Sequence, residues 1–185
     1  MSEEMLVCHC SPTLAGLKTG SLFSCPYSSQ KMIIKEIREF NQKLTQKGIR
    51  IIPVRISDKR MLVYVYRPEK LKEDFSDEKT QIILKCKGYD CTNPSQCICR
   101  LIQKLQSDPD FPHEIGLFLG YPAEDVKGFI ENRAEGYKCS GCWKVYGNEQ
   151  EAKCRFERFR RCTSIYCSQW SRGKSIECLT VAAGS

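Results

Sequence analysis

Residues 49–67, which read IRIIPVRISDKRMLVYVYR, decide the fold class of this chain. They hold two runs rich in β-branched and aromatic residues, Ile49 to Ile56 and Met61 to Arg67, separated by the polar residues 57–60. Such runs are typical of strands, and a short polar connection between them predicts a β-hairpin. Because Pro53 cannot donate a hydrogen bond to a neighbouring strand, its strand is predicted at a sheet edge or with a bulge there.

Helical patterns flank this hairpin on both sides. Between Ser28 and Gly48, apolar residues recur at helical spacing, with serine before the start and glycine after the end. Further helices are predicted at residues 69–75, 78–87 and 94–106, from Pro122 to about Ile130, and after the capping residue Asn148. Together these elements predict an α+β fold, with a mixed or antiparallel sheet that contains the hairpin and is covered by helices.

Five shorter elements complete the prediction. Together with the others they are predicted to form a single domain over residues 1–185. The tail from about residue 168 has the weakest pattern. The remaining predicted elements are a strand at Met5–Cys10 with a short helix at 13–17, a central strand at Glu114–Gly120, a strand at Trp143–Tyr146, and a final strand at Ile176–Val181.

Length and charge exclude several classes of protein. A chain of 185 residues that is 41% hydrophobic is long enough to bury a sizeable core. No apolar run approaches the roughly 18 residues of a membrane span, and the N-terminus is acidic, so we expect a cytoplasmic protein without membrane insertion. The formal net charge of +7 invites nucleic-acid binding, but the basic residues are dispersed among acidic ones, which disfavours it.

Thirteen cysteines are the strongest anomaly of composition. In a small secreted chain this density would indicate a disulfide framework. Because the number is odd and no export signal precedes it, we interpret the cysteines as reduced thiols or metal ligands. A reducing or anaerobic host would tolerate many of them.

The segment Cys139-Ser140-Gly141-Cys142 has the spacing at which two thiolates bind one metal ion or form a redox disulfide. A strand is predicted directly after it, which favours a metal-type turn over a thioredoxin-like helix start. Cys8 and Cys10 are candidates to complete a tetrahedral site for zinc or iron. Two other pairs stay open as alternatives, namely Cys97 with Cys99 and Cys162 with Cys167.

A second kind of chemistry involves Cys10 and His113. Cys10 precedes Ser11-Pro12, a predicted helix start whose dipole would favour the thiolate, and His113 begins a predicted strand. A cysteine at a helix start and a distant histidine at a strand start are the arrangement of thiol hydrolases, in which histidine activates the nucleophile. Here Cys10 would be the nucleophile, His113 the base and Glu114 the group that orients it.

Several stretches together resemble an uncharacterised bacterial family, the domain of unknown function numbered thirty-seven ninety-three, over nearly the whole chain. These stretches are residues 10–18 (CSPTLAGLK), 111–116 (FPHEIG), 119–122 (LGYP), 124–126 (EDV), 128–129 (GF) and 143–146 (WKVY). The resemblance implies an anaerobic bacterial host, a redox or iron-related role without an established activity, and flavodoxin or iron-metabolism proteins as partners. It includes the positions of Cys10 and His113.

The sequence therefore leaves three functions open. The first is a cytoplasmic thiol-rich protein that binds a metal or a redox-linked ligand. The alternative is a thiol hydrolase or transferase that uses Cys10 and His113. The third is a basic adaptor that binds nucleic acid.

Overall fold

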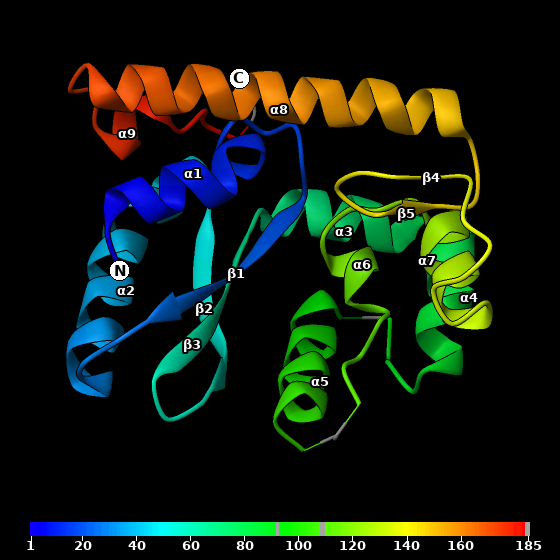
Figure 1. Cartoon of the computed structure of the whole chain (residues 1–185). Coiled ribbons are helices and arrows are strands. Elements are labelled where there is room, and N and C mark those ends of the chain that lie inside the picture. The colour runs from blue at the N-terminus through cyan, green and yellow to red at the C-terminus, as the bar shows by residue number, and fades with distance from the viewer. Residues whose placement is uncertain (92, 108–109, 184–185) are drawn as a thin grey trace. The chain divides into compact units, whose positions relative to one another are not determined.

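The computed structural model describes residues 1–91, 93–107 and 110–183, and the chain divides into two compact units. Unit 1 comprises residues 1–70 and 159–185, and unit 2 comprises residues 71–158. Figure 1 labels the helices and strands of both. The predicted α+β class, with an antiparallel sheet, a hairpin and covering helices, is confirmed. The organisation of residues 1–185 as a single domain stays a prediction.

The sheet of unit 1 has three antiparallel strands in the order β1-β3-β2 (Figure 1). They are β1 (Gly20–Pro26), β2 (Arg50–Ile56) and β3 (Arg60–Tyr66). β2 and β3 form the predicted hairpin, and Pro53 lies in the edge strand β2, next to a shift in pairing register. Proline has no N–H to donate, and at an edge strand beside a register shift this lack breaks no regular series of hydrogen bonds between strands. β1 was not predicted, because its glycine, serine and proline residues resemble a turn.

The core of unit 1 lies between one face of this sheet and the helices α1 (Glu3–Leu14) and α2 (Gln30–Leu44). Alternate residues point into it, so Phe23 of β1 and its register partner Val63 of β3 are both buried. Ile33 and Ile37 contribute from α2, which begins after the cap Ser29, as predicted. The 3₁₀ turn η1 (Thr45–Lys47) then ends at Gly48, whose φ of 76° is left-handed.

The strand predicted at Met5–Cys10 and the helix predicted at 13–17 are wrong, because residues 3–14 form the single helix α1. Ser2 caps this helix by accepting a hydrogen bond from the amide of Met5 at 3.3 Å, and two glutamates follow in the first turn. The fully buried side chains recur at helical spacing and include Leu6, Val7, Cys10 and Leu14. Cys10 therefore lies well inside a helix, and Pro12 does not begin one.

The strand predicted at Ile176–Val181 is also wrong. The long helix α8 (Glu149–Ser171) starts after Asn148 as predicted, and the short helix α9 (Ile176–Leu179) follows it. Ser175 caps α9 by accepting a hydrogen bond from the Cys178 amide at 3.3 Å. Ile176 and Leu179 then enter the core of unit 1.

The buried side chain of Arg67 connects three parts of unit 1. Its Nε donates to the carbonyl of Thr13 at 2.7 Å, and its Nη2 donates to the carbonyls of Leu14 at 2.6 Å and Val181 at 2.7 Å. Nη1 donates to the carbonyl of Lys47 at 3.3 Å. Burial lowers the pKa of this guanidinium, because it removes water from around the charge. The four carbonyl oxygens accept the hydrogen bonds that water would otherwise accept.

The described residues of unit 2 are mainly helical and include one two-stranded hairpin. Its elements are the end of α3 (Pro68–Ser76), α4 (Glu78–Cys86), α5 (Pro94–Ser107), α6 (Ile115–Phe118), α7 (Ala123–Glu131), β4 (Cys139–Ser140), β5 (Lys144–Val145) and the start of α8. The helices α3, α4, α5 and α7 and the strand β5 agree with the prediction.

The central strand predicted at Glu114–Gly120 is wrong, because this segment forms the short helix α6. The amide of Leu119 donates to the carbonyl of Ile115 at 3.1 Å, and the amide of Tyr121 donates to the carbonyl of Gly116 at 3.0 Å. Gly120, with a φ of 75°, permits the turn that follows. A short apolar run fits a buried strand and a buried helix equally well, so periodicity did not distinguish them.

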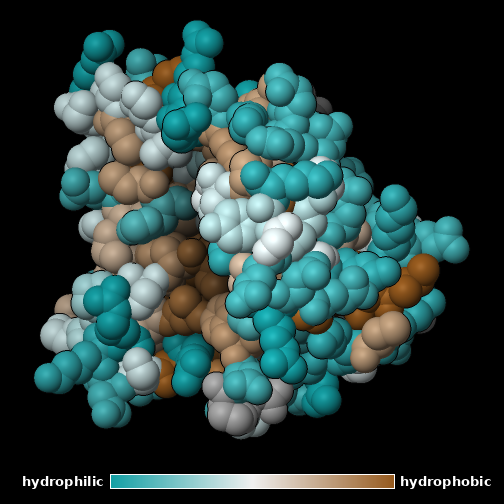
Figure 2. Space-filling view, turned by 45° about the vertical axis from the view of Figure 1, so that its right-hand side comes forward, coloured by the Kyte–Doolittle hydropathy of each residue, from teal (hydrophilic) through white to brown (hydrophobic). Residues whose placement is uncertain are grey.

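Hydrophilic side chains cover most of the face shown in Figure 2, with smaller apolar areas between them. Within the described residues, no helix has both the length and the apolar character needed to cross a bilayer.

Candidate functional site

Asp125 joins helix α7 to the β4–β5 hairpin in unit 2. Only 3% of this residue is exposed, and both carboxylate oxygens accept hydrogen bonds. Oδ1 accepts from the amides of Tyr146 at 2.7 Å and Gly147 at 2.8 Å, and Oδ2 accepts from the indole Nε1 of Trp143 at 2.7 Å. Charge-assisted bonds of this kind are short and directional, so Asp125 fixes the orientation of the Trp143 ring.

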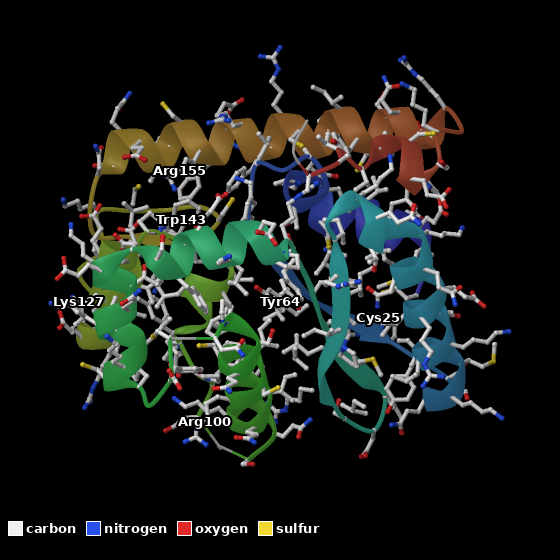
Figure 3. The ribbon with its side chains drawn as sticks, turned by 180° about the vertical axis from the view of Figure 1, so that it is seen from behind. Cys25, Tyr64, Arg100, Lys127, Trp143 and Arg155 are labelled. Atoms are coloured by element: carbon white, nitrogen blue, oxygen red, sulfur yellow. The ribbon has the colours of Figure 1, made fainter. Side chains whose placement is uncertain are left out.

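Trp143 is held on its other sides by aromatic rings. It stacks on Tyr121 with ring centroids 4.7 Å apart and meets Phe156 of α8 edge to face at 4.5 Å. Figure 3 shows Trp143 below the first turns of α8, near Arg155. Burial raises the pKa of Tyr121 to about 12, and its hydroxyl donates to the carbonyl of Cys142 at 3.3 Å.

A pocket of about 200 Å³ opens beside these rings, and we call it the aromatic pocket. Its walls are mostly apolar, and its lining residues are His113, Ile115, Gly116, Leu119, Tyr121, Asp125, Val126, Phe129, Cys142, Trp143 and Lys144. The rings of His113 and Phe129 meet at a centroid distance of 4.9 Å and an angle of 66°. Lys144 donates to the carbonyl of Ala134 at 2.8 Å. His113 and Cys142 are the exposed residues of the lining.

Gly116 is required where α6 approaches α7 at this pocket. A Cβ at this position would lie 2.7 Å from Val126 Cγ2 and 3.2 Å from Tyr121 Cδ2. Carbon atoms do not approach so closely, so a larger residue would push two walls of the pocket apart.

Cys10 does not have the environment that the thiol-hydrolase prediction assumed. It lies inside α1 with none of its surface exposed, and burial raises the pKa of its thiol to about 12. A nucleophilic cysteine needs the opposite shift and access to solvent. The predicted position at a helix start is therefore wrong.

His113 and Glu114 lie in unit 2, whereas Cys10 lies in unit 1. His113 is exposed and contacts the rings of Phe129 and Phe111. Glu114 is buried, and its Oε1 accepts from Lys104 Nζ at 2.7 Å and from the Tyr89 hydroxyl at 3.0 Å. Burial alone would raise the pKa of Glu114, but Lys104 and the other hydrogen bonds hold it below its ordinary value. The assignment of the three residues to one catalytic site stays a prediction.

Cys139 lies in β4, where it pairs with Val145 of β5, and Cys142 lies in the connection between the two strands. The proposed partners Cys8 and Cys10 belong to unit 1. Within the residues that the structure describes, no cluster brings together three or more histidine, cysteine, aspartate or glutamate side chains that could hold a metal. Zinc or iron binding by these cysteines stays a prediction.

Sequence reasoning missed the part that Asp125 and Trp143 have in this site. Asp125 was placed only in the predicted helix from Pro122 and in the stretch 124–126, and Trp143 only in the predicted strand and in the stretch 143–146. A signal was present in the sequence, because every lining residue except Cys142 belongs to one of the stretches at 111–116, 119–122, 124–126, 128–129 and 143–146. Those stretches carried the family resemblance.

The comparison with protein families agrees with that resemblance. The family model described as "Protein of unknown function (DUF3793)" matches residues 6–180, which are nearly the whole chain. The chain therefore belongs to this family. Neither the curated proteins nor the solved structures contain a match to it.

Proposed function

We propose that this protein binds a small, planar, redox-active organic ligand in the aromatic pocket of unit 2. The observation that carries the proposal is the preorganised wall formed by Trp143, which Asp125 orients by the 2.7 Å hydrogen bond and Tyr121 supports by stacking. A rigid aromatic wall beside a concave, mostly apolar space is typical of sites for ring-shaped ligands.

The size of the pocket limits the ligand. Sites for drug-sized molecules occupy roughly 300–1,000 Å³, so about 200 Å³ corresponds to a ligand of one or two fused rings. The imidazole of His113 offers a hydrogen bond at the exposed side of the lining, which favours a ring that carries a carbonyl or carboxylate group.

Cys142 supports the redox-linked part of the proposal. It is exposed and lines the same pocket, and a thiolate is the protein nucleophile best suited to attack an electron-poor ring such as a quinone. We favour an organic ligand over a metal because the hairpin supplies only the two thiols of Cys139 and Cys142, and a structural metal site needs about four ligands.

The relation of the pocket to the family resemblance gives a second line of support. The short stretches quoted above for that resemblance supply nearly all of the lining. Two basic residues of α8, Arg155 and Lys153, form ion pairs with Glu151 and Glu149, and this pairing of opposite charges disfavours the nucleic-acid adaptor.

Tryptophan fluorescence tests the proposal directly. The chain has two tryptophans, so the variant Trp170→Phe leaves Trp143 as the only reporter, and it lies in the pocket wall. Titration with benzoate, indole and 1,4-naphthoquinone should give saturable quenching by at least one of them. The variant Phe129→Ala should weaken that binding by about tenfold or more, because it removes one aromatic wall.

Phe111→Ala is the matched control, because Phe111 contacts His113 but does not line the pocket. It should leave the affinity unchanged. Cys142→Ser separates reversible binding from covalent addition of the quinone. Equal quenching in wild type and Phe129→Ala, or no saturable signal with any of the three probes, would refute the proposal. Metal analysis of anaerobically purified protein tests the metal alternative, since stoichiometric metal that disappears in a Cys139→Ser, Cys142→Ser double variant would establish it instead.

A further inference from the structure

Two cysteines far apart in sequence meet at the surface of unit 1. The Sγ atoms of Cys8 on α1 and Cys167 on α8 lie 3.7 Å apart, although 159 positions separate them in the chain. Cys8 is exposed and Cys167 is half-buried. All thirteen cysteines are present as thiols, so this contact joins two S–H groups.

The backbone on both sides of this contact is firmly held. Leu6, Val7 and Cys10, the neighbours of Cys8 on α1, are fully buried in the core. Tyr166, Cys167 and Trp170 pack against the same core from α8. The two thiols are therefore kept together by helices that cannot easily separate, which gives each thiol a high effective concentration for the other.

A second neighbouring pair lacks this accessibility. Cys91 and Cys97 interact in unit 2, but Cys97 is fully buried and its thiol donates to the carbonyl of Asp90 at 3.0 Å. A dissolved disulfide cannot reach Cys97 without local opening. The pair formed by Cys8 and Cys167 thus combines proximity with exposure.

We infer that Cys8 and Cys167 are a reversible redox site that forms a disulfide by exchange with a small disulfide of the glutathione class. The Cys8 thiolate attacks one sulfur of the dissolved disulfide, which forms a mixed disulfide and releases one molecule of thiol. The Cys167 thiolate then attacks the Cys8 sulfur, and the second thiol leaves. Cys8 and Cys167 lose two protons and two electrons, which reduce the dissolved disulfide to two thiols.

The environment of Cys8 sets the rate and the direction of this exchange. Although Cys8 is exposed, partial desolvation of its sulfur raises the pKa of the thiol, and the contact with Cys167 and the nearby charge of Glu4 raise it further. The reaction should therefore accelerate as the pH rises, because the thiolate is the attacking form. Thiols that are weak acids are also poor leaving groups, which favours the closed disulfide over reduction.

Exchange with oxidised glutathione tests this site on the full chain. The reduced protein is incubated with the disulfide, quenched with acid, alkylated and digested with trypsin without reduction. The expected product joins the peptides 1–18 and 162–172. Because these peptides also contain Cys10 and Cys162, fragmentation must place the link at Cys8 and Cys167.

The disulfide should also raise the melting temperature, because it closes a loop that spans most of the chain. We expect a rise of about 5 °C or more relative to the reduced protein. The variants Cys8→Ser and Cys167→Ala should show neither the linked peptides nor the rise. Cys178→Ser, which removes another exposed thiol of unit 1, should retain both.

Three results would overturn the inference. The first is a glutathione adduct that stays on Cys8 without transfer to Cys167. The second is a disulfide that forms first between Cys91 and Cys97 or that involves Cys178. The third is a linked protein whose melting temperature equals that of Cys8→Ser after the same treatment.

Discussion

The indole N–H of Trp143 donates a hydrogen bond of 2.7 Å to the carboxylate of Asp125, eighteen positions earlier in the chain. The same carboxylate also accepts hydrogen bonds from the backbone amides of Tyr146 and Gly147. Through these three bonds, helix α7 holds the β4–β5 hairpin in position. One carboxylate thus organises the aromatic wall of the pocket.

The substitution Asp125→Asn should destabilise the protein by about 1–3 kcal/mol. An asparagine side chain can still accept from the two amides, but its NH₂ group then faces the indole N–H, and two donors cannot bond. Urea unfolding followed by Trp143 fluorescence in the Trp170→Phe background measures the effect. Asp110→Asn, at an exposed position, is the control and should change stability by less than about 0.5 kcal/mol. Equal stabilities of the two variants would show that the Asp125 carboxylate does not hold the hairpin.

The ion pair between Glu114 and Lys104 should make stability fall in acid. The pKa of Glu114 is lower in the folded protein than its ordinary value of 4.5. The ion pair therefore contributes fully to the free energy of unfolding above pH 4.5. This contribution disappears as the pH falls through the pKa that Glu114 has in the folded protein. Glu114→Gln should cost about 2 kcal/mol at pH 7 and lose part of the acid dependence. Urea unfolding at pH 7 and pH 4 checks both effects, and parallel acid profiles of wild type and variant would contradict them.

Cys10 should resist alkylation in the native protein. Its thiol is fully buried, and its pKa is raised to about 12, so neither access nor thiolate is available near neutral pH. Peptide mapping after brief treatment with iodoacetamide should find Cys8 modified well before Cys10. If Cys10 instead reacts as fast as Cys8, and His113→Ala slows it, the thiol-hydrolase prediction gains its required nucleophile.

Arg67→Lys should destabilise unit 1 by about 2–4 kcal/mol, because a lysine ammonium cannot reproduce the fork that donates to the carbonyls of Thr13, Leu14 and Val181. Thermal unfolding measures the loss. Arg38→Lys is the control, because Arg38 lies on the exposed side of α2 and the lysine keeps its charge in water. This variant should leave the melting temperature unchanged. Identical melting temperatures for these two variants would mean that the buried guanidinium of Arg67 and its hydrogen bonds add nothing to stability.

The sequence predicted those elements whose pattern has a single interpretation. The hairpin at residues 49–67 alternates β-branched and aromatic residues around a polar turn, and α2 repeats its apolar residues at helical spacing over four turns. Residues 5–10 of α1, and residues 114–120 around α6, were predicted as strands, because a short apolar run is buried whichever conformation it adopts. The caps and hydrogen bonds of the folded chain, such as the bond that the Met5 amide donates to the Ser2 hydroxyl, distinguish the helix from a strand.

The candidate site was harder to predict for a related reason. The aromatic pocket depends on which rings stack and on the position of one carboxylate, and neither is encoded by residue spacing. The contact between Cys8 and Cys167 depends on α1 being a helix, since a strand would have placed Cys8 on a different face. Because residues 5–10 were predicted as a strand, the contact between these two thiols could not be predicted.

Unit 1 is built from two segments that are separated in the chain by unit 2, and this separation has a consequence for its synthesis. Ile176 and Leu179 complete its core, and the carbonyl of Val181 occupies one donor of Arg67. During translation, the sheet and helices α1 and α2 emerge from the ribosome about a hundred residues before these partners do. Unit 2 is contiguous and has all of its own residues earlier. The nascent chain must therefore expose an unfinished core in the meantime, and chaperones that bind apolar segments should associate with residues 1–70 until α9 has emerged.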